Sequence, residues 1–350
     1  MFPTKSHPPS QMFDDWDEPV WNPDVHLNLS KPPEKVVLLK PNFPEHQIPP
    51  PMGSDGRSAL AYSEPFQFLS KQGVKDLRRV VDYNIKYAVD GVKNTARIPL
   101  CLRGMGYRSK FIRDMNNCPK TLEFLSNIAG VEIIPSDYET SWGHTNVGVI
   151  GNDLPVDQWH IDSVPFVLVI LLSDMSDSIG GDLQVIKRAP FQKAFERIQE
   201  TKNRLSKEEV LTVNYPTQGC AIFMQGSQMV HHVTPVIQAK ERRISVVNSY
   251  QPKNCKYPDD TRLGVFKNEP ETCFHEFARH RAIRARQRLD DFLSSESWVS
   301  EPTQNAKELR EVANQLNEAC DILVGSKDDT VKYFLETNKL KHADEKKSKL

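Results

Sequence analysis

The spacing of hydrophobic positions changes twice along the chain and divides it into three blocks. From Ser70 to residue 130, apolar residues recur at steps of three and four, which places them on one face of a helix. Between Val131 and Pro252 they form short runs rich in β-branched and aromatic residues, separated by turn residues. That pattern is typical of strands. After Pro252 the helical spacing returns, so the chain reads as a β block between two helical blocks.

The helical blocks carry recognisable start and stop residues. Ser70 is a candidate N-cap and Gly91 a candidate stop for a helix between them, and Gly130 would close a helix that begins at Pro119. The other predicted helices span 110–115, 191–203, 274–293, 303–323 and 330–339.

The central block predicts about eight short strands. They span 131–134, 146–150, 164–172, 183–186, 210–213, 220–224, 229–236 and 244–249. Eight short strands in one continuous block are typical of two packed sheets. We therefore expect a mainly β core, a double-stranded β-helix (jelly roll, cupin-like), with N-terminal and C-terminal α-helical segments.

These patterns suggest five regions. Residues 1–60 form a proline-rich arm, which cannot be a regular helix or a central strand because proline lacks the backbone donor. Its apolar run at 36–39 would anchor it to the domain surface. Residues 61–130 would be a helical flank packed on the barrel, 131–252 the β core, 253–340 the C-terminal helices, and 341–350 a polar tail.

Composition narrows the class of protein. Hydrophobic residues make up 38% and charged residues 26%, as in soluble globular domains, and no apolar run reaches the roughly 20 residues of a membrane span. A net charge of -1 argues against nucleic acid as a partner, which requires a basic surface. Six scattered cysteines without a CxxC pair argue against a zinc site, and with no secretory signal at the start we expect reduced, mostly buried thiols.

The last three residues are Ser348-Lys349-Leu350, the tripeptide that the peroxisomal import receptor binds. They follow a lysine-rich, polar stretch that should be accessible. We therefore expect a peroxisomal protein with the import receptor as a partner. An accidental ending on a basic tail, and a cytoplasmic protein, is the alternative.

Metal-ligating and anion-binding residue types gather in the β block. Because alternate side chains of a strand share a face, His160 and Asp162 should project together, as should Arg243 and Ser245. His231 lies on a strand between these pairs. Two histidines and one carboxylate leave half of an iron's coordination sphere open, as non-heme Fe(II) oxygenases require. An arginine can fork onto a carboxylate, which a lysine cannot do.

The order of these motifs resembles that of the Fe(II)/2-oxoglutarate-dependent oxygenases, in particular the branch that oxidises small molecules. The matching residues are His160-Ile161-Asp162, the His-x-Val-Thr-Pro segment that starts at His231, and Arg243-Ile244-Ser245. The resemblance covers about a third of the chain, from Val131 to Pro252.

The resemblance implies roles for single residues. His160, Asp162 and His231 would hold the metal, and Arg243 and Ser245 would bind the distal carboxylate of 2-oxoglutarate. Further cosubstrate contacts would come from the strands before the His-x-Asp motif, with Asn146 and Tyr138 as candidates. Two alternatives stay open, namely His232 as a metal ligand and Arg242 as the anion clamp.

The same resemblance implies an oxidoreductase, a dioxygenase that uses Fe(II), 2-oxoglutarate and O2, with ascorbate helpful in vitro. It would oxidise an unactivated C–H bond of an amino acid or natural-product intermediate by hydroxylation, desaturation or ring closure, and release succinate and CO2. The alternatives are a hydroxylase or demethylase of protein or nucleic acid, and a catalytically silent barrel used as a binding module. A homodimer through the C-terminal helices is a further expectation.

Other ionisable residues are expected on the surface. The histidines outside the β block are His26, His46, His275, His280 and His342. The arginine-rich stretch 279–288 reads as the solvated face of an amphipathic helix.

Overall fold

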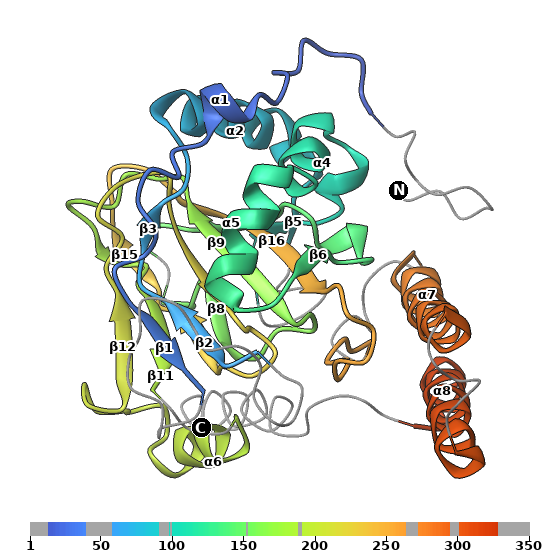
Figure 1. Ribbon diagram of the computed structural model, residues 1–350. Helices are drawn as coiled ribbons and strands as arrows, with labels where there is room; N and C mark the ends of the chain where they lie inside the picture. The colour runs from blue at the N-terminus through green and yellow to red at the C-terminus, as the bar shows by residue number, and fades with distance from the viewer. Residues whose placement is uncertain are drawn as a thin grey trace.

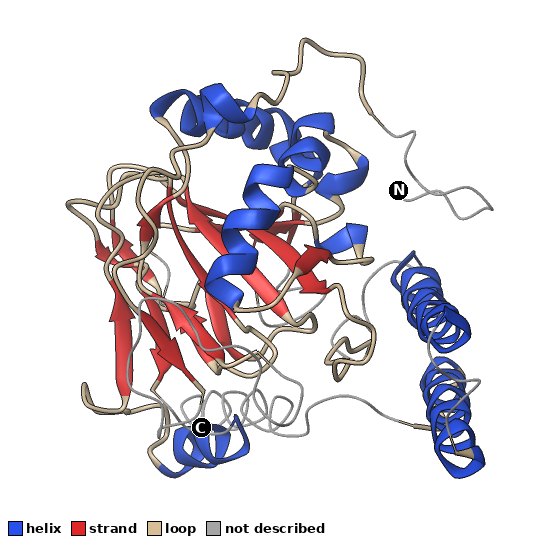
Figure 2. Cartoon of the chain, viewed as in Figure 1, coloured by secondary structure: helices blue, strands red, loops and turns tan. Residues whose placement is uncertain are grey.

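The computed structural model describes residues 13–39, 58–90, 98, 100–151, 153–187, 191–263, 272–294 and 301–327. Its centre is built of β-sheets, and helices lie around them (Figure 2). The expected mainly β core with flanking helices is confirmed. None of the described helices combines the length and the apolar character that crossing a bilayer requires.

Ten described strands form one large sheet with the order β1-β2-β13-β9-β16-β7-β5-β4, while β3 pairs with β13 and β6 with β16. Its strands are β1 (Val36–Leu38), β2 (Leu60–Ser63), β3 (Phe66–Gln67), β4 (Val89–Asp90), β5 (Leu100–Leu102), β6 (Ile133–Pro135), β7 (His144–Gly148), β9 (Phe166–Leu171), β13 (Cys220–Met224) and β16 (Arg243–Pro252). The pairings in this sheet are antiparallel.

A smaller sheet has the order β12-β11-β14-β8. It consists of β8 (Asp157–His160), β11 (Leu183–Ile186), β12 (Val210–Val213) and β14 (His231–Val233). A two-stranded ribbon joins β10 (Ile179–Gly180) to β15 (Val236–Gln238).

The large sheet is buried on both faces. In β9, Phe166, Leu168 and Ile170 belong to one apolar cluster, while Val167 and Val169 belong to another that also holds Val185 and Val233 of the small sheet. Because successive side chains point to opposite faces, this division shows that one face meets the helices and the other the small sheet. A strand buried on both faces needs the unbroken apolar run that β9 has.

The described helices are α1 (Pro23–His26), α2 (Lys71–Asn84), α4 (Lys110–Asn116), α5 (Pro119–Ala129), α6 (Phe191–Glu200), α7 (Thr272–Ser294) and α8 (Pro302–Leu323). Helices α1, α2, α4 and α5 lie over one side of the large sheet, α6 lies below the small sheet, and α7 and α8 stand together to the side (Figure 1). Leu77 of α2 and Leu125 of α5 join the cluster on the outer face of the large sheet. Phe195 of α6 packs instead with Trp159 of the small sheet.

Local capping residues set several helix ends as predicted. Ser70 accepts a hydrogen bond from the Gly73 N–H at the start of α2, and Gly130 ends α5 in the left-handed conformation at φ 68°. The helix that starts after Ser70 ends earlier than expected, at Asn84, because a 3₁₀ turn at Ile85–Tyr87 follows.

The N-terminal third contains strands that the sequence pattern did not indicate. Val36–Leu38 pairs with Leu60–Ser63 as β1 and β2, and Tyr62 pairs with Met224 of β13. The segment at 36–38 is an edge strand, which agrees with the expectation that the proline-rich arm forms no central strand, whereas the 61–130 flank is not only helical as expected. An apolar run between prolines gains ladder hydrogen bonds on one side by pairing with the edge of the sheet.

Some predictions lie outside the described residues. They concern the Gly91 stop, the helix at 330–339, the tail with Ser348-Lys349-Leu350, and two surface histidines, His46 and His342. The expectation for the cysteines is confirmed: all six are free, five are buried, and Cys320 is exposed.

Candidate metal centre

An irregularity in β8 turns two polar side chains toward the interior. His231 of β14 pairs with His160, and Val233 pairs with Asp157, so three steps on β8 oppose two steps on β14. An extra residue of this kind is a β-bulge, which re-aims the side chains next to it. Asp157 and His160 therefore share the inner face although they are three residues apart, and their side chains approach to 3.5 Å.

Both histidines are oriented by their own strands. Nδ1 of His160 lies 2.6 Å from the Gln158 carbonyl oxygen, and Nδ1 of His231 lies 2.9 Å from that of Met229. Because a carbonyl only accepts, each Nδ1 carries the proton and each Nε2 presents a lone pair. This arrangement is the usual support for a metal-binding imidazole.

Asp162 lies two residues beyond the end of β8, not within the strand as predicted. Its N–H donates to the Gly226 carbonyl at 2.9 Å, which holds the segment against the turn before β14. A Cβ at position 226 would come within 2.0 Å of the Asp162 Oδ2. Glycine at 226 therefore makes room for the carboxylate.

The three side chains converge. Asp162 Oδ1 lies 3.5 Å from Nε2 of His160, Asp162 Oδ2 lies 3.5 Å from Nε2 of His231, and the two imidazole centroids are 4.1 Å apart. One ligand atom of each residue lies within 4.8 Å of the others. Burial and the neighbouring His160 lower the pKa of His231 to about 4, so this imidazole is neutral near pH 7 and able to bind a metal.

Arg243 and Ser245 share one face of β16, as predicted. Arg243 is almost fully buried, with Nε donating to the Gly181 carbonyl at 2.6 Å and Nη1 to Ser245 Oγ at 2.9 Å. Within the described part of the chain, its buried Nη2 has no hydrogen-bond partner. A buried guanidinium with one unsatisfied donor has the chemistry to bind an anion.

Asn146 links this arginine strand to the metal ligands. It pairs with Ser245 across β7 and β16, and its Nδ2 donates to Asp157 Oδ2 at 3.3 Å. Asp157 in turn contacts His160. The predicted polar residue at 146 thus lies in a continuous buried chain, and Asp157 is the member that the sequence analysis missed. Asp157 faces inward only because of the β-bulge in β8, which the sequence pattern did not indicate.

Two tyrosines occupy different environments. Tyr138 is fully buried and meets His280 of α7 at a ring centroid distance of 6.1 Å. Its role in cosubstrate binding stays a prediction. Tyr215, which the sequence analysis did not select, has a buried hydroxyl without a hydrogen-bond partner among the described residues. Burial raises its pKa, and the positive charge of Arg243 acts in the opposite direction, so the two groups are neighbours.

The structure argues against the two alternatives that the sequence left open, namely His232 as a metal ligand and Arg242 as the anion clamp. Nε2 of His232 hydrogen-bonds to Gln184 Oε1 at 2.7 Å, and its ring stacks on Trp159 at 3.7 Å. His232 therefore lies on the face of β14 opposite to His231. Arg242 is exposed, whereas Arg243 is buried.

Two histidines expected on the surface are buried. His26 bonds to Asp76, and His280 lies between Asp137 and Asp259 with 3.0 Å contacts on both nitrogens.

The expectation that the arginine-rich stretch 279–288 is a solvated face is also wrong in part. The buried Arg284 donates to the carbonyls of Cys255 and Tyr257. These partners are distant in sequence, so no local pattern indicated them.

Comparison with known proteins finds one family model and several solved structures that are similar to this chain. The model of a family described as Halogenase D matches residues 92–259. No curated protein matches the chain. Similar solved structures include the non-heme alpha ketoglutarate dependent epimerase SnoN from nogalamycin biosynthesis, at 14% identity and a TM-score of 0.39 over 55% of this chain and 78% of that one.

Two others are HygX from Streptomyces hygroscopicus with nickel and 2-oxoglutarate bound, and a Pseudomonas putida prolyl-4-hydroxylase. HygX has 11% identity and a TM-score of 0.40 over 55% of this chain and 83% of its own. The hydroxylase has 13% identity and a TM-score of 0.35 over 55% of this chain and 94% of its own. At these identities and TM-scores the similarity decides neither the reaction nor the substrate of this chain.

Proposed function

We propose that this protein is an Fe(II)- and 2-oxoglutarate-dependent oxygenase that oxidises a C–H bond of a small molecule. The observation that carries the proposal is the pairing of two sites inside one pair of sheets. One is a convergent His160, Asp162 and His231 set with both Nε2 atoms presented, and the other is a buried Arg243 with an unsatisfied donor.

The residues fit the groups that this chemistry requires. Two imidazoles and one carboxylate are a ligand set typical of Fe(II) in oxygenases, and a buried guanidinium beside a serine suits the distal carboxylate of a dicarboxylic acid. Bound iron and 2-oxoglutarate would supply the oxidising power. The chain's own residues orient the imidazoles, hold Asp162 against Gly226 and neutralise the dicarboxylate.

We further propose that the two sheets form a double-stranded β-helix. In chain order, the strands β7, β9, β13 and β16 belong to the large sheet, and β8, β11, β12 and β14 belong to the small one. The continuous block of strands therefore contributes four strands to each of the two sheets, as in a jelly roll. Such a barrel brings the inner faces of β8, β14 and β16 together.

Halogenation is the second candidate, because the matching family model is described as Halogenase D. Coordination favours oxygenation. His160, Asp162 and His231 would give a bound metal three protein ligands, and a halide ligand would need the place that the carboxylate takes. With Asp162 in place no position remains for a halide. A halogenated product formed in the presence of chloride would overturn this assignment.

The test is metal binding and turnover in the full chain. Wild type loaded with Fe(II) and given 2-oxoglutarate and ascorbate in air should form succinate, and Asp162→Ala should lose both iron and succinate formation. Asp114→Ala, at an exposed helical position, is the control that should behave as wild type. Equal, negligible iron in wild type and Asp162→Ala would instead support a silent binding module.

The substrate class rests on charge. A near-neutral chain lacks the basic surface that a nucleic-acid substrate requires, so we propose a small molecule such as an amino acid or natural-product intermediate. Product masses from a panel of such compounds test this, and oxidation of a peptide or oligonucleotide alone would contradict it.

A further inference from the structure

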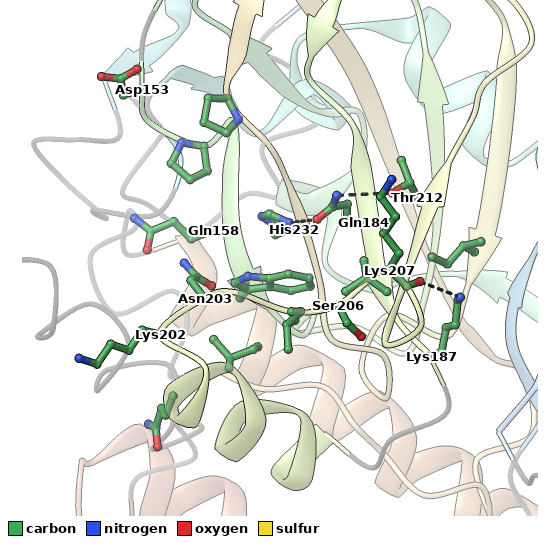
Figure 3. A pocket seen from close by; sticks show the side chains of 18 residues that line it. Asp153, Gln158, Gln184, Lys187, Lys202, Asn203, Ser206, Lys207, Thr212 and His232 are labelled. Carbon is green, nitrogen blue, oxygen red and sulfur yellow. Dashed lines mark hydrogen bonds between the residues drawn. The ribbon is translucent and has the colours of Figure 1, made fainter.

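A cavity of about 1180 Å³ lies on the outer face of the small sheet (Figure 3). Trp159 and His232 line it, whereas their chain neighbours His160 and His231 turn to the metal centre. The cavity and the metal centre therefore lie on opposite faces of β8 and β14.

The wall of this cavity is part apolar and part amide. Ile198 of α6, Leu205 of the following turn and Leu211 of β12 contribute aliphatic surface. Gln158, Gln184, Gln199 and Asn203 contribute amides. Stacking between Trp159 and His232, and the bond from His232 to Gln184, hold part of the lining in a fixed geometry.

Positive charge dominates the rim. Lys187, Lys202 and Lys207 line the cavity, and the single carboxylate among its lining residues is Asp153. Lys187 Nζ donates to the Lys207 carbonyl at 3.2 Å, which keeps the first and third of these residues together (Figure 3). An anion that enters the cavity therefore meets a net positive rim.

The backbone at one edge of the cavity is strained. Lys202 and Asn203 have φ of 49° and 69°, and they are the only non-glycine residues with positive φ in the part of the chain that the structure describes. Their N–H groups bond back to Gln199 and Ile198. The two residues follow α6 (Phe191–Glu200) and close its C-terminal end, which fixes the course of the chain at this edge of the cavity.

We propose that this outer cavity binds an amphipathic organic anion, a molecule with an apolar body and a carboxylate or phosphate group. The body would lie against the aliphatic residues and the acid group at the lysine rim. The volume slightly exceeds the range of about 300–1,000 Å³ typical of small-molecule sites, so a ligand of ordinary metabolite size fits. This inference does not depend on the proposed oxygenase activity.

The test uses the full chain without added metal and the fluorescent anion 8-anilinonaphthalene-1-sulfonate as the probe. Decanoate and indole-3-acetate, as displacing ligands, distinguish an acyl body from an aromatic one, and decanol tests the need for charge. The triple variant Lys187→Glu/Lys202→Glu/Lys207→Glu should weaken probe binding by about tenfold or more, since three attractive charges become repulsive.

Two further variants complete the experiment. Lys31→Glu/Lys71→Glu/Lys307→Glu changes the net charge equally at exposed lysines outside the cavity lining and should bind like wild type. Thr212→Trp, at an exposed position on β12, should fill the cavity and reduce binding without changing charge. Equal probe affinity in the wild type, the cavity triple variant and Thr212→Trp would overturn the proposal, as would displacement by decanol as effective as that by decanoate.

Discussion

Replacement of Arg243 by lysine is the sharpest test of the anion clamp. Nε of the guanidinium donates to the Gly181 carbonyl and Nη1 donates to Ser245 Oγ, which leaves Nη2 as the donor available to a ligand. Lysine keeps the positive charge but offers a single point donor on a flexible stem. The substitution therefore removes the Nη2 donor and the two hydrogen bonds that hold it in place, while it preserves most of the electrostatic attraction.

The expected loss follows from one charge-assisted hydrogen bond. Such a bond contributes about 1.5–3 kcal/mol, so the dissociation constant for 2-oxoglutarate should rise by about 10- to 150-fold. Iron affinity should stay near that of wild type, because Arg243 contacts none of the three ligands in any hydrogen bond or ion pair that involves the described residues.

Anaerobic calorimetry of 2-oxoglutarate binding to the Mn(II)-loaded protein measures the first quantity, and metal titration of the same variant measures the second. Arg242→Lys is the matched control, since this neighbour is exposed. Unchanged cosubstrate affinity in Arg243→Lys, or an equal loss in Arg242→Lys, would refute the assignment of the clamp. A thermal melt separates loss of binding from loss of fold.

The remaining predictions concern three other residues. Gly226→Ala places a Cβ 2.0 Å from Asp162 Oδ2, so Fe(II) affinity in a metal titration should fall by about tenfold or more, and unchanged affinity would contradict the ligand role of Asp162. His280→Asn breaks a buried contact with Asp259, and denaturant unfolding near pH 6 should show a loss of about 3–5 kcal/mol. Burial lowers the pKa of His280 but the two carboxylates raise it further, so its stabilisation is complete below the unfolded pKa and disappears as pH rises through the folded one. A difference from wild type that grows with pH would be inconsistent with this. Burial raises the pKa of Glu276 from 4.5 to about 7, so wild type loses stability as pH rises across that window. Glu276→Gln should therefore gain up to about 3 kcal/mol over wild type above pH 7 and nothing near pH 4, and a pH-independent difference would refute the shift.

Local signals in the sequence predicted much of the fold. The strands β11, β12 and β13 begin and end at the predicted residues, because turn residues flank each apolar run. The helix α5 does so because Pro119 starts it and Gly130 ends it. The strand β1 was missed because proline content outweighed a three-residue apolar run whose partner, β2, lies more than 20 residues further along.

The candidate site, like the fold, could be predicted where the signal is local in the sequence and not where it depends on distant contacts. His160, Asp162, His231, Arg243 and Ser245 were identifiable from motif order alone, since each motif is only a few residues long. The inward orientation of Asp157 depends on an irregular strand register. The relevance of Tyr215 depends on the nearby guanidinium of Arg243, which comes from β16. Neither relation leaves a trace in a linear pattern of residue types, so both had to be found in three dimensions.

The additional residue in β8 has a consequence for how this protein can change. Removing Gln158 would abolish the bulge and, with it, the carbonyl that accepts the hydrogen bond from Nδ1 of His160. Insertions and deletions are therefore tolerable before this segment but not inside it. Any redesign of this segment should therefore keep its length constant and leave Asp157 and His160 unchanged.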